Sequence, residues 1–314
     1  MSDLHVVLGA TGGIGAALVQ ELHARGTPTR AVSRHVTELD VPAGVHAYRA
    51  DLTDPAAVGS AVGDASVIYH AAQPPYTRWP QEFPGLTSRI ADASAAAGAT
   101  LVVADNLYMY GPHNAPLTEL TAQQANDHKG AVRRTMAADL LERHARGDLR
   151  VVLGRASDYY GPGGVASALG ESLFGRAVAG RPAQAVGRPD RLHTMSFLPD
   201  VARALVLLAE QPNAHGQAWH LPAAEPLTGQ QLVDLIAACL GKAVRVRTAG
   251  RRTLRLLGLA NPMLREIADV SYQWEQPFIS SSWAFEQAFG PFPVTPHHDA
   301  VAQTVSWWQA RQAA

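Results

Sequence analysis

The sequence has only one cysteine, Cys239, among its 314 residues. A single thiol cannot form a disulfide within the chain, which excludes the disulfide-rich secreted scaffolds and favours a reducing compartment such as the cytoplasm. Cys239 lies in the apolar segment LVDLIAACLG. A lone thiol in such a segment is predicted to pack in the interior rather than to act as a nucleophile.

The sequence also lacks an excess of charge, because 26 Lys and Arg residues nearly balance 27 Asp and Glu residues. No long-range field of one sign is expected, which argues against nucleic acid and anionic membranes as partners. No apolar run is long enough to cross a bilayer, and the most apolar one, ARALVLLAE, predicts a core helix. No His, Cys and acidic residues have the spacing of metal ligands, so no metal site is predicted.

What the sequence does contain is an alternation of short apolar runs with longer segments of helical period. This alternation predicts an α/β fold with a doubly wound parallel sheet of the Rossmann type. The predicted strands are His5–Leu8, Thr29–Ser33, His46–Ala50, Ser66–His70, Leu101–Asp105 and Arg150–Arg155. The predicted helices lie near Ile14–Arg25, Pro55–Val62, Pro84–Ala97, Ala131–Arg146, Pro199–Glu210 and Gly229–Leu240.

The strongest local motif is LGATGGIG, which joins the first predicted strand to the first predicted helix. Gly9 permits a tight turn, Gly12 lets the backbone approach a diphosphate, and Gly15 lets the helix pack against the strand. The motif predicts a dinucleotide site that also includes Thr11, Gly13 and Ile14. Residues 1–155 are therefore predicted to form a dinucleotide-binding domain. Residues 156–314 are predicted to form a smaller mixed α/β substrate-binding portion that returns strands and helices to the first domain.

The end of the second predicted strand carries Ser33 and Arg34, where NAD-preferring sites commonly have an acid. A guanidinium group matches the 2′-phosphate of NADP, so NADP is the predicted cofactor and NAD is the alternative. Asp51, followed by Leu52 at the end of the third strand, suits a contact to the adenine edge. An N-cap of the next helix is the other interpretation of Asp51.

Several segments together resemble one family. They are GATGGIG at 9–15, Asp51-Leu52, His70-Ala71-Ala72, LYMYG at 107–111, RASDYYGPG at 155–163 and SFLPDVARA at 196–204. In this order they are similar to the landmarks of the short-chain dehydrogenase/reductase superfamily, in its extended and atypical branches that include NAD-dependent epimerases and dehydratases. The resemblance implies that His70, Ala71 and Ala72 lie beside the nicotinamide ribose.

The resemblance also implies a Ser-Tyr-Lys catalytic triad, and this sequence departs from it. The serine position holds Asn106, the tyrosine position Lys129 and the lysine position Arg133. Asn106 can polarise a carbonyl, Lys129 can exchange a proton if its pKa is depressed, and Arg133 can hold a ribose or phosphate. Tyr108 is the best placed substitute for the missing tyrosine. A solvated helix face carrying Lys129 and Arg133 is the other interpretation.

On the substrate side, Gln73 and Tyr76 follow the fourth strand, where open α/β sheets bind ligands. Asp158 occupies the position of a family Asn that helps to hold the substrate in sugar-nucleotide enzymes. Trp274 and Phe278 are predicted to be core residues.

These observations favour an NAD(P)-dependent oxidoreductase of the extended or atypical short-chain type that acts on a carbonyl or secondary alcohol of a small molecule. A sugar-nucleotide epimerase or dehydratase is one alternative. A non-catalytic NADP-binding sensor is the other. Pairing of two copies through the helices near 85–97 and 131–146 is left open.

Overall fold

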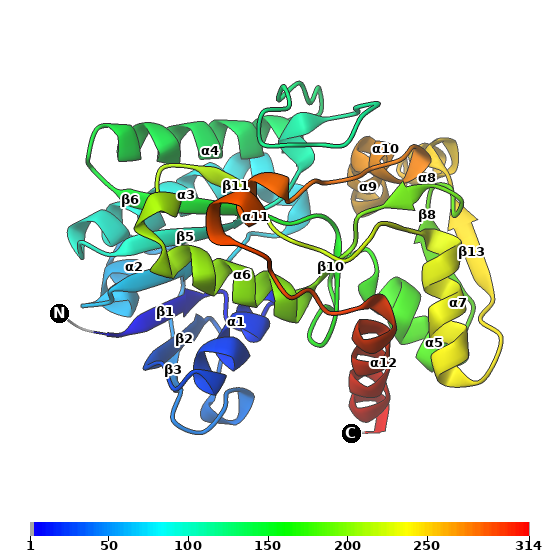
Figure 1. Ribbon diagram of the computed structural model, residues 1–314, viewed down its shortest axis with the longest axis horizontal. Coiled ribbons are helices and arrows are strands. Elements are labelled where there is room, and N and C mark those ends of the chain that lie inside the picture. Colours follow the sequence, from blue (N-terminus) through cyan, green and yellow to red (C-terminus); the bar gives the residue numbers. More distant parts are fainter. Residues whose placement is uncertain (1–2, 314) are drawn as a thin grey trace.

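The structure is a computed structural model that describes residues 3–313 (Figure 1). The strands are β1 His5–Leu8, β2 Thr29–Ser33, β3 His46–Arg49, β4 Val67–His70, β5 Thr100–Asp105, β6 Arg150–Arg155, β7 Tyr159–Tyr160, β8 Ala183–Val186, β9 Leu192–His193, β10 Ser196–Phe197, β11 Ala218–His220, β12 Leu227–Thr228 and β13 Val246–Ala249. The helices are α1 Gly13–Ala24, α2 Pro55–Val62, α3 Trp79–Ala96, α4 His128–Ala145, α5 Arg176–Val178, α6 Leu198–Glu210, α7 Gly229–Leu240, α8 Arg251–Leu257, α9 Pro262–Val270, α10 Tyr272–Glu275, α11 Trp283–Phe289 and α12 His297–Ala313. Short 3-10 turns lie at Glu38–Asp40, Tyr76–Arg78, Tyr108–Tyr110 and Pro212–Ala214, and a π-helical segment spans Gly170–Gly175.

The central sheet confirms the predicted fold class. Within the described residues, seven parallel strands pair in the order β11-β6-β5-β4-β1-β2-β3. The strand order reverses between β1 and β4, which is the switch point where open α/β sheets bind ligands. The six predicted strands all form, and β1, β2 and β6 have the predicted bounds.

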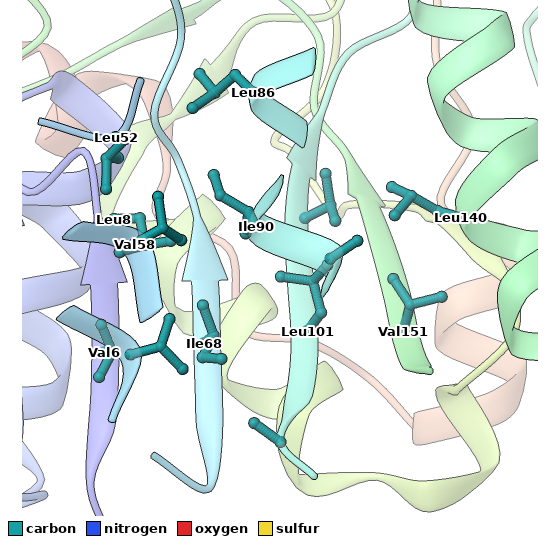
Figure 2. Packing of buried hydrophobic residues seen from close by; sticks show 14 of the residues in the cluster. Val6, Leu8, Leu52, Val58, Ile68, Leu86, Ile90, Leu101, Leu140 and Val151 are labelled. Carbon is teal, nitrogen blue, oxygen red and sulfur yellow. The ribbon is translucent and has the colours of Figure 1, made fainter. Parts of the chain in front are cut away.

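Two apolar layers cover the sheet, one on each face. On one face, α2, α3 and α4 bury a cluster that includes Val58, Ile90 and Leu140 (Figure 2). On the other face, α1, α6 and α11 bury Leu18, Leu205 and other residues against the same strands. Because both faces are covered, successive strand residues are apolar rather than alternating.

Helix α3 begins earlier than predicted. The sequence suggested a start at Pro84, but the helix runs from Trp79 and contains Pro84 in its interior. A proline there removes one backbone hydrogen bond. Trp79 and Phe83 are each only 2% exposed, and their burial offsets that loss.

The seventh strand and one cap were not predicted. Strand β11 is only three residues long, too short for its apolar pattern to be recognised. Helix α4 begins at His128 instead of Ala131, because the Asp127 carboxylate accepts a hydrogen bond from the Gly130 amide at 2.8 Å and caps it there.

The prediction for the single cysteine was wrong, because Cys239 is exposed. It lies near the end of the amphipathic helix α7, whose buried face is formed by Leu232, Val233 and Ile236 instead. No helix within residues 3–313 is long and apolar enough to span a membrane.

The substrate-side elements form a separate apolar cluster. Helices α5, α7 and α12 surround Phe174, Ile236 and Trp308. In Figure 1 these elements, with β8 and β13, lie beside the central sheet rather than over it. Strand β11 and helices α6 and α11 return from the second half of the chain to the sheet. A domain boundary at residue 155 stays a prediction.

Candidate active site

One continuous cleft of about 1380 Å³ runs along the carboxyl ends of the central strands and continues between the two groups of elements. Most of the site residues predicted from the sequence line it. These are Gly9, Thr11, Gly12, Gly13, Ile14, Ser33, Arg34, Asp51, Leu52, Ala71, Ala72, Gln73, Tyr76, Asn106, Tyr108, Arg133 and Asp158. Gly15, His70 and Lys129 do not line the cleft.

The three glycines of the first loop have three different environments. Gly9 has a φ of +88°, and a Cβ there would lie 2.6 Å from the Ala72 backbone. A Cβ on Gly15 would lie 2.1 Å from the Gly9 carbonyl oxygen. A Cβ on Gly12 would meet only that same oxygen, at 3.4 Å, and would otherwise point into open space. Gly9 and Gly15 are therefore required by the fold, whereas Gly12 leaves room for a ligand at the cleft.

Helix α1 starts at Gly13, directly behind Gly12, which is its N-cap. The first amide groups of a helix have no partner within it and carry a partial positive charge. Those of Gly13 and Ile14 lie at the cleft, whereas the Gly12 amide already donates a hydrogen bond to the Gly9 carbonyl at 3.0 Å. This end of the cleft is suited to an anionic group such as a diphosphate.

The adjacent strand ends supply polar groups at the predicted adenosine end. The Ser33 and Thr11 hydroxyl groups lie 2.9 Å apart, and Arg34 is exposed at the cleft. Asp51 accepts hydrogen bonds from the amide and hydroxyl of Thr53, and these bonds lower its pKa. The N-cap of α2 is Asp54 and not Asp51, so Asp51 is not the cap of that helix.

His70 lies beneath the cleft rather than in it. It is 2% exposed, and its Nε2 is 3.0 Å from the Thr87 hydroxyl. Burial lowers the pKa of His70 to about 3, and the nearby Arg133 charge adds to this effect. The imidazole is therefore neutral, and Ala71 and Ala72 are the residues of this segment that reach the cleft.

The residues at the carboxyl end of β5 lie at the centre of the site. Asp105 is buried and accepts a hydrogen bond from Arg133 at 3.3 Å and from Arg155 at 3.1 Å. The Asn106 side-chain oxygen accepts a hydrogen bond from the Tyr108 amide at 3.2 Å. One carboxylate thus fixes two buried guanidinium groups, and the Asn106 turn directs Tyr108 along the cleft.

Arg133 lines the cleft wall, and its predicted role of holding a ribose or phosphate stays a prediction. Its guanidinium carbon lies 4.7 Å from the ring centre of Trp79 and 4.5 Å from that of Phe83. Its side chain is only 7% exposed, and its Nε has no hydrogen-bond partner within the described residues. The Arg133 guanidinium is therefore fixed by aromatic rings and shielded from solvent, so it is not part of a solvated helix face.

Lys129 is fully buried behind the cleft wall. Its ammonium lies 2.8 Å from Glu266 and donates a hydrogen bond to the Tyr76 carbonyl at 2.5 Å. It also lies 3.9 Å from the Tyr76 ring centre. Burial lowers the pKa of Lys129, and the bond to Glu266 opposes that shift. The solvated interpretation of Lys129 does not hold, and its ammonium supports Tyr76 rather than facing the cleft.

Tyrosine hydroxyl groups gather around the middle of the cleft. The Tyr76 hydroxyl donates to the Tyr108 hydroxyl at 3.5 Å, and Tyr159 lines the same region. Burial raises the pKa of Tyr108, and the Asp158 carboxylate adds to this rise. The hydrogen bond from Tyr76 and the Arg133 charge act in the opposite direction. Tyr108 is therefore protonated at neutral pH and can donate a proton.

Asp158 belongs to a pair that sequence reasoning missed. Its Oδ2 lies 3.0 Å from Nε2 of His193, and Nδ1 of His193 lies 3.0 Å from the Gln273 carbonyl oxygen. A carbonyl only accepts, so Nδ1 of His193 donates in the bond to Gln273. Trp274 stacks on the imidazole with 3.8 Å between ring centres.

The other sequence predictions for this region have mixed outcomes. Phe278 is 2% exposed, as predicted for a core residue. Trp274 lines the cleft as well as packing on His193, so it is not simply a core residue. Glu266 was not singled out from the sequence, although it is the first acid after a long run without any.

Comparisons with known proteins agree with this architecture. A model of the NAD dependent epimerase/dehydratase family matches residues 5–221. No curated protein matches the sequence. Among solved structures, MoeE5 in complex with UDP-glucose and NAD has 22% identity and a TM-score of 0.79, with 100% of both chains covered.

Two epimerases have the same fold. UDP-glucuronic acid 4-epimerase from Bacillus cereus, solved with UDP-glucuronic acid and NAD, has 15% identity and a TM-score of 0.80, and 99% of this chain and 100% of that chain are covered. UDP-glucose 4-epimerase from Thermus thermophilus, solved with NAD, has 20% identity and a TM-score of 0.77, with 99% and 100% covered.

Proposed function

The chain belongs to the NAD-dependent epimerase/dehydratase family, as its resemblance suggested, and from this premise we propose that it transforms a sugar nucleotide through transient oxidation of one hydroxyl. A bound nicotinamide dinucleotide accepts and returns a hydride in such chemistry. The proposal favours the epimerase or dehydratase alternative over a net oxidoreductase. It is supported by the family match and by the UDP-sugars bound to MoeE5 and to the B. cereus epimerase.

The observation that carries the proposal is the continuity of the cleft. The same cavity is lined by Gly12 at the α1 N-terminus and by Tyr108 and Asp158 at its middle. A dinucleotide whose diphosphate lies at Gly12 would extend its nicotinamide end toward Tyr108. Hydroxyl and carboxyl groups there suit the hydroxyl groups of a sugar.

Residues of this chain would accept and return the proton of the reacting substrate hydroxyl. We assign Tyr108 to the exchange of a proton with the reacting substrate oxygen, because it lies on the cleft and its hydroxyl is held by Tyr76. When the alcohol becomes a carbonyl, its proton would pass to Tyr108, and the Asp158 carboxylate, whose charge acts on Tyr108, would take up the proton that Tyr108 gives up. The reverse transfers accompany reduction. Asn106 would orient the substrate oxygen, and Arg133 would hold the nicotinamide ribose or a phosphate.

The direct test is incubation of the purified protein and cofactor with UDP-glucose and UDP-glucuronic acid. Epimerisation or dehydration predicts a new sugar nucleotide on chromatography, without net accumulation of reduced nicotinamide. Stoichiometric accumulation of reduced nicotinamide would instead support the net oxidoreductase. Tight dinucleotide binding without turnover of nucleotide sugars, carbonyls or alcohols would support the sensor.

One feature supports the alternative function, net oxidation or reduction of a small molecule. This feature is the apolar wall of the outer cleft. This wall consists of Val186, Leu254, Leu257, Met263, Leu264 and Ile267. An apolar wall suits the carbon skeleton of a small alcohol or ketone at least as well as a nucleotide.

Replacing Tyr108 with phenylalanine tests the proton assignment. Tyr108→Phe should reduce turnover by about a hundredfold or more, because a general acid-base group is lost, while dinucleotide binding is unchanged. Turnover is measured at saturating substrate, and binding by NADPH fluorescence. Tyr48→Phe, on β3 and outside the cleft, is the matched control and should behave as wild type. Full turnover by Tyr108→Phe would refute the assignment.

The cofactor proposal is NADP, with NAD as the alternative, and Arg34 is the residue that tests it. Arg34→Ala should weaken NADP binding by about ten- to hundredfold, since a charged hydrogen bond contributes about 1.5–3 kcal/mol, and should leave NAD binding nearly unchanged. Titration calorimetry with both dinucleotides measures this. Arg49→Ala, exposed at the end of β3 and outside the cleft, is the control. Equal losses for NAD and NADP would contradict the 2′-phosphate assignment.

A further inference from the structure

The even overall charge conceals a strongly basic segment. From residue 235 to residue 265 the sequence has no Asp or Glu. It has seven cationic residues there, Lys242, Arg245, Arg247, Arg251, Arg252, Arg255 and Arg265, and all seven are exposed. Glu266, the next acid, is buried and bound to Lys129, so it neutralises none of them at the surface.

The same segment exposes large apolar side chains at one place. Helices α8 and α9 pack against each other as a hairpin, and the turn between them spans residues 258–261. Around this turn Leu256 is 69% exposed, Leu257 49%, Leu259 86% and Met263 42%. We call these four residues the apolar tip. Figure 1 shows α8 and α9 at the edge of the molecule, away from the central sheet.

The exposure of the apolar tip does not come from poor packing of the α8–α9 hairpin. The inner face of the hairpin is already packed, because Leu254 is 3% exposed and Ala268 0%. The outer face therefore combines leucines that have no covering element with flanking arginines. Contiguous exposed apolar residues of this kind mark interaction sites.

The charge of the flanking residues selects among the candidate partners. A second copy of this chain pairing through the same tip would bring two sets of arginines together, and like charges repel. A nucleic acid would contact the arginines but has no use for four exposed apolar side chains on the same surface. An anionic bilayer satisfies both, because apolar side chains enter the headgroup–acyl boundary while cations remain at the lipid phosphates.

We propose that the apolar tip of the α8–α9 hairpin docks this protein on an anionic membrane surface. Leu256 and Leu259 insert at the boundary, and Arg251, Arg252 and Arg255 lie against anionic headgroups. Leu257 and Met263 belong both to the tip and to the lining of the cleft. Docking would therefore bring the mouth of the cleft to the membrane surface. The proposal is independent of the sugar-nucleotide assignment, because it uses no residue of the catalytic centre.

Vesicle flotation of the full chain tests the proposal without a substrate. We expect the protein to float with vesicles of phosphatidylcholine mixed with phosphatidylglycerol, to bind pure phosphatidylcholine far less, and to be released by salt. The double variant L256S/L259S should lose about tenfold or more of its partitioning, and so should R251Q/R252Q/R255Q. All five positions are exposed, so the variants should fold, and thermal unfolding checks this.

Matched controls use exposed leucines elsewhere. Leu39 is 97% exposed and Leu120 96% exposed, and L39S/L120S should bind vesicles as wild type does. No flotation of the wild type, equal binding to neutral vesicles, or unchanged binding of L256S/L259S would each overturn the proposal. A dimer in sedimentation that L256S/L259S abolishes, without vesicle binding, would assign the tip to a second copy instead. Binding to duplex DNA that L256S/L259S leaves unchanged, again without vesicle binding, would assign the cations to nucleic acid.

Discussion

Gly12→Val is expected to abolish the binding of nicotinamide dinucleotides while leaving the fold intact. The valine side chain would occupy the space in front of the α1 N-terminus, where the backbone must approach a diphosphate. Within the protein, its Cβ would have only one contact, at 3.4 Å to the Gly9 carbonyl oxygen. The affinity for NADP and NAD, measured by calorimetry, should fall below detection, with little change in the melting temperature.

Two other glycines separate loss of binding from loss of folding. Gly15→Ala should destabilise the protein, because its Cβ would lie 2.1 Å from the Gly9 carbonyl oxygen and overpacking costs about 1–3 kcal/mol. Gly59→Val, in α2, should change neither binding nor stability appreciably, because nothing lies within 4 Å of a Cβ there. Normal NADP binding by Gly12→Val would contradict the placement of the diphosphate.

Asp105→Ala is expected to lower the free energy of unfolding by about 3–5 kcal/mol, because breaking a buried ion pair leaves charge without compensation. Here one carboxylate holds both Arg133 and Arg155, whose side chains are 7% and 2% exposed. The Tyr110 hydroxyl accepts a hydrogen bond from Arg155 at 2.7 Å but carries no negative charge to replace Asp105. Urea unfolding followed by circular dichroism measures the loss.

The control for Asp105 is an ion pair at the surface. Asp92 pairs with Arg143, but its side chain is 66% exposed, so water screens the interaction. Asp92→Ala should change the free energy of unfolding by about 1 kcal/mol or less. If Asp105→Ala lowered the free energy of unfolding as little as Asp92→Ala is expected to, the buried Asp105 pairs would not stabilise the fold.

Local sequence patterns predicted much of the fold, because burial on both faces of a parallel sheet leaves continuous apolar runs. The start of α3 was mispredicted because Pro84 was taken as a helix boundary, whereas the burial of Trp79 and Phe83 extends the helix past it. Strand β11 was missed because three residues form a strand only when they pair with β6.

The cofactor end of the site was predicted better than its centre, for a physical reason. The glycine loop is a local motif, so its conformation follows from adjacent residues. The contacts of Lys129 with Glu266, and of Asp158 with His193, join residues that are far apart in the sequence. No local pattern indicates such pairs. Charge balance over the whole chain likewise concealed the basic segment at 235–265.

A crystal structure of the protein with NADP and a nucleotide sugar would test the central claim most directly. The account predicts a diphosphate beside Gly12, over the amides of Gly13 and Ile14, with the nicotinamide ring beside Tyr108 and the sugar near Asp158. An empty cleft under saturating dinucleotide, or a dinucleotide bound away from the α1 N-terminus, would contradict it.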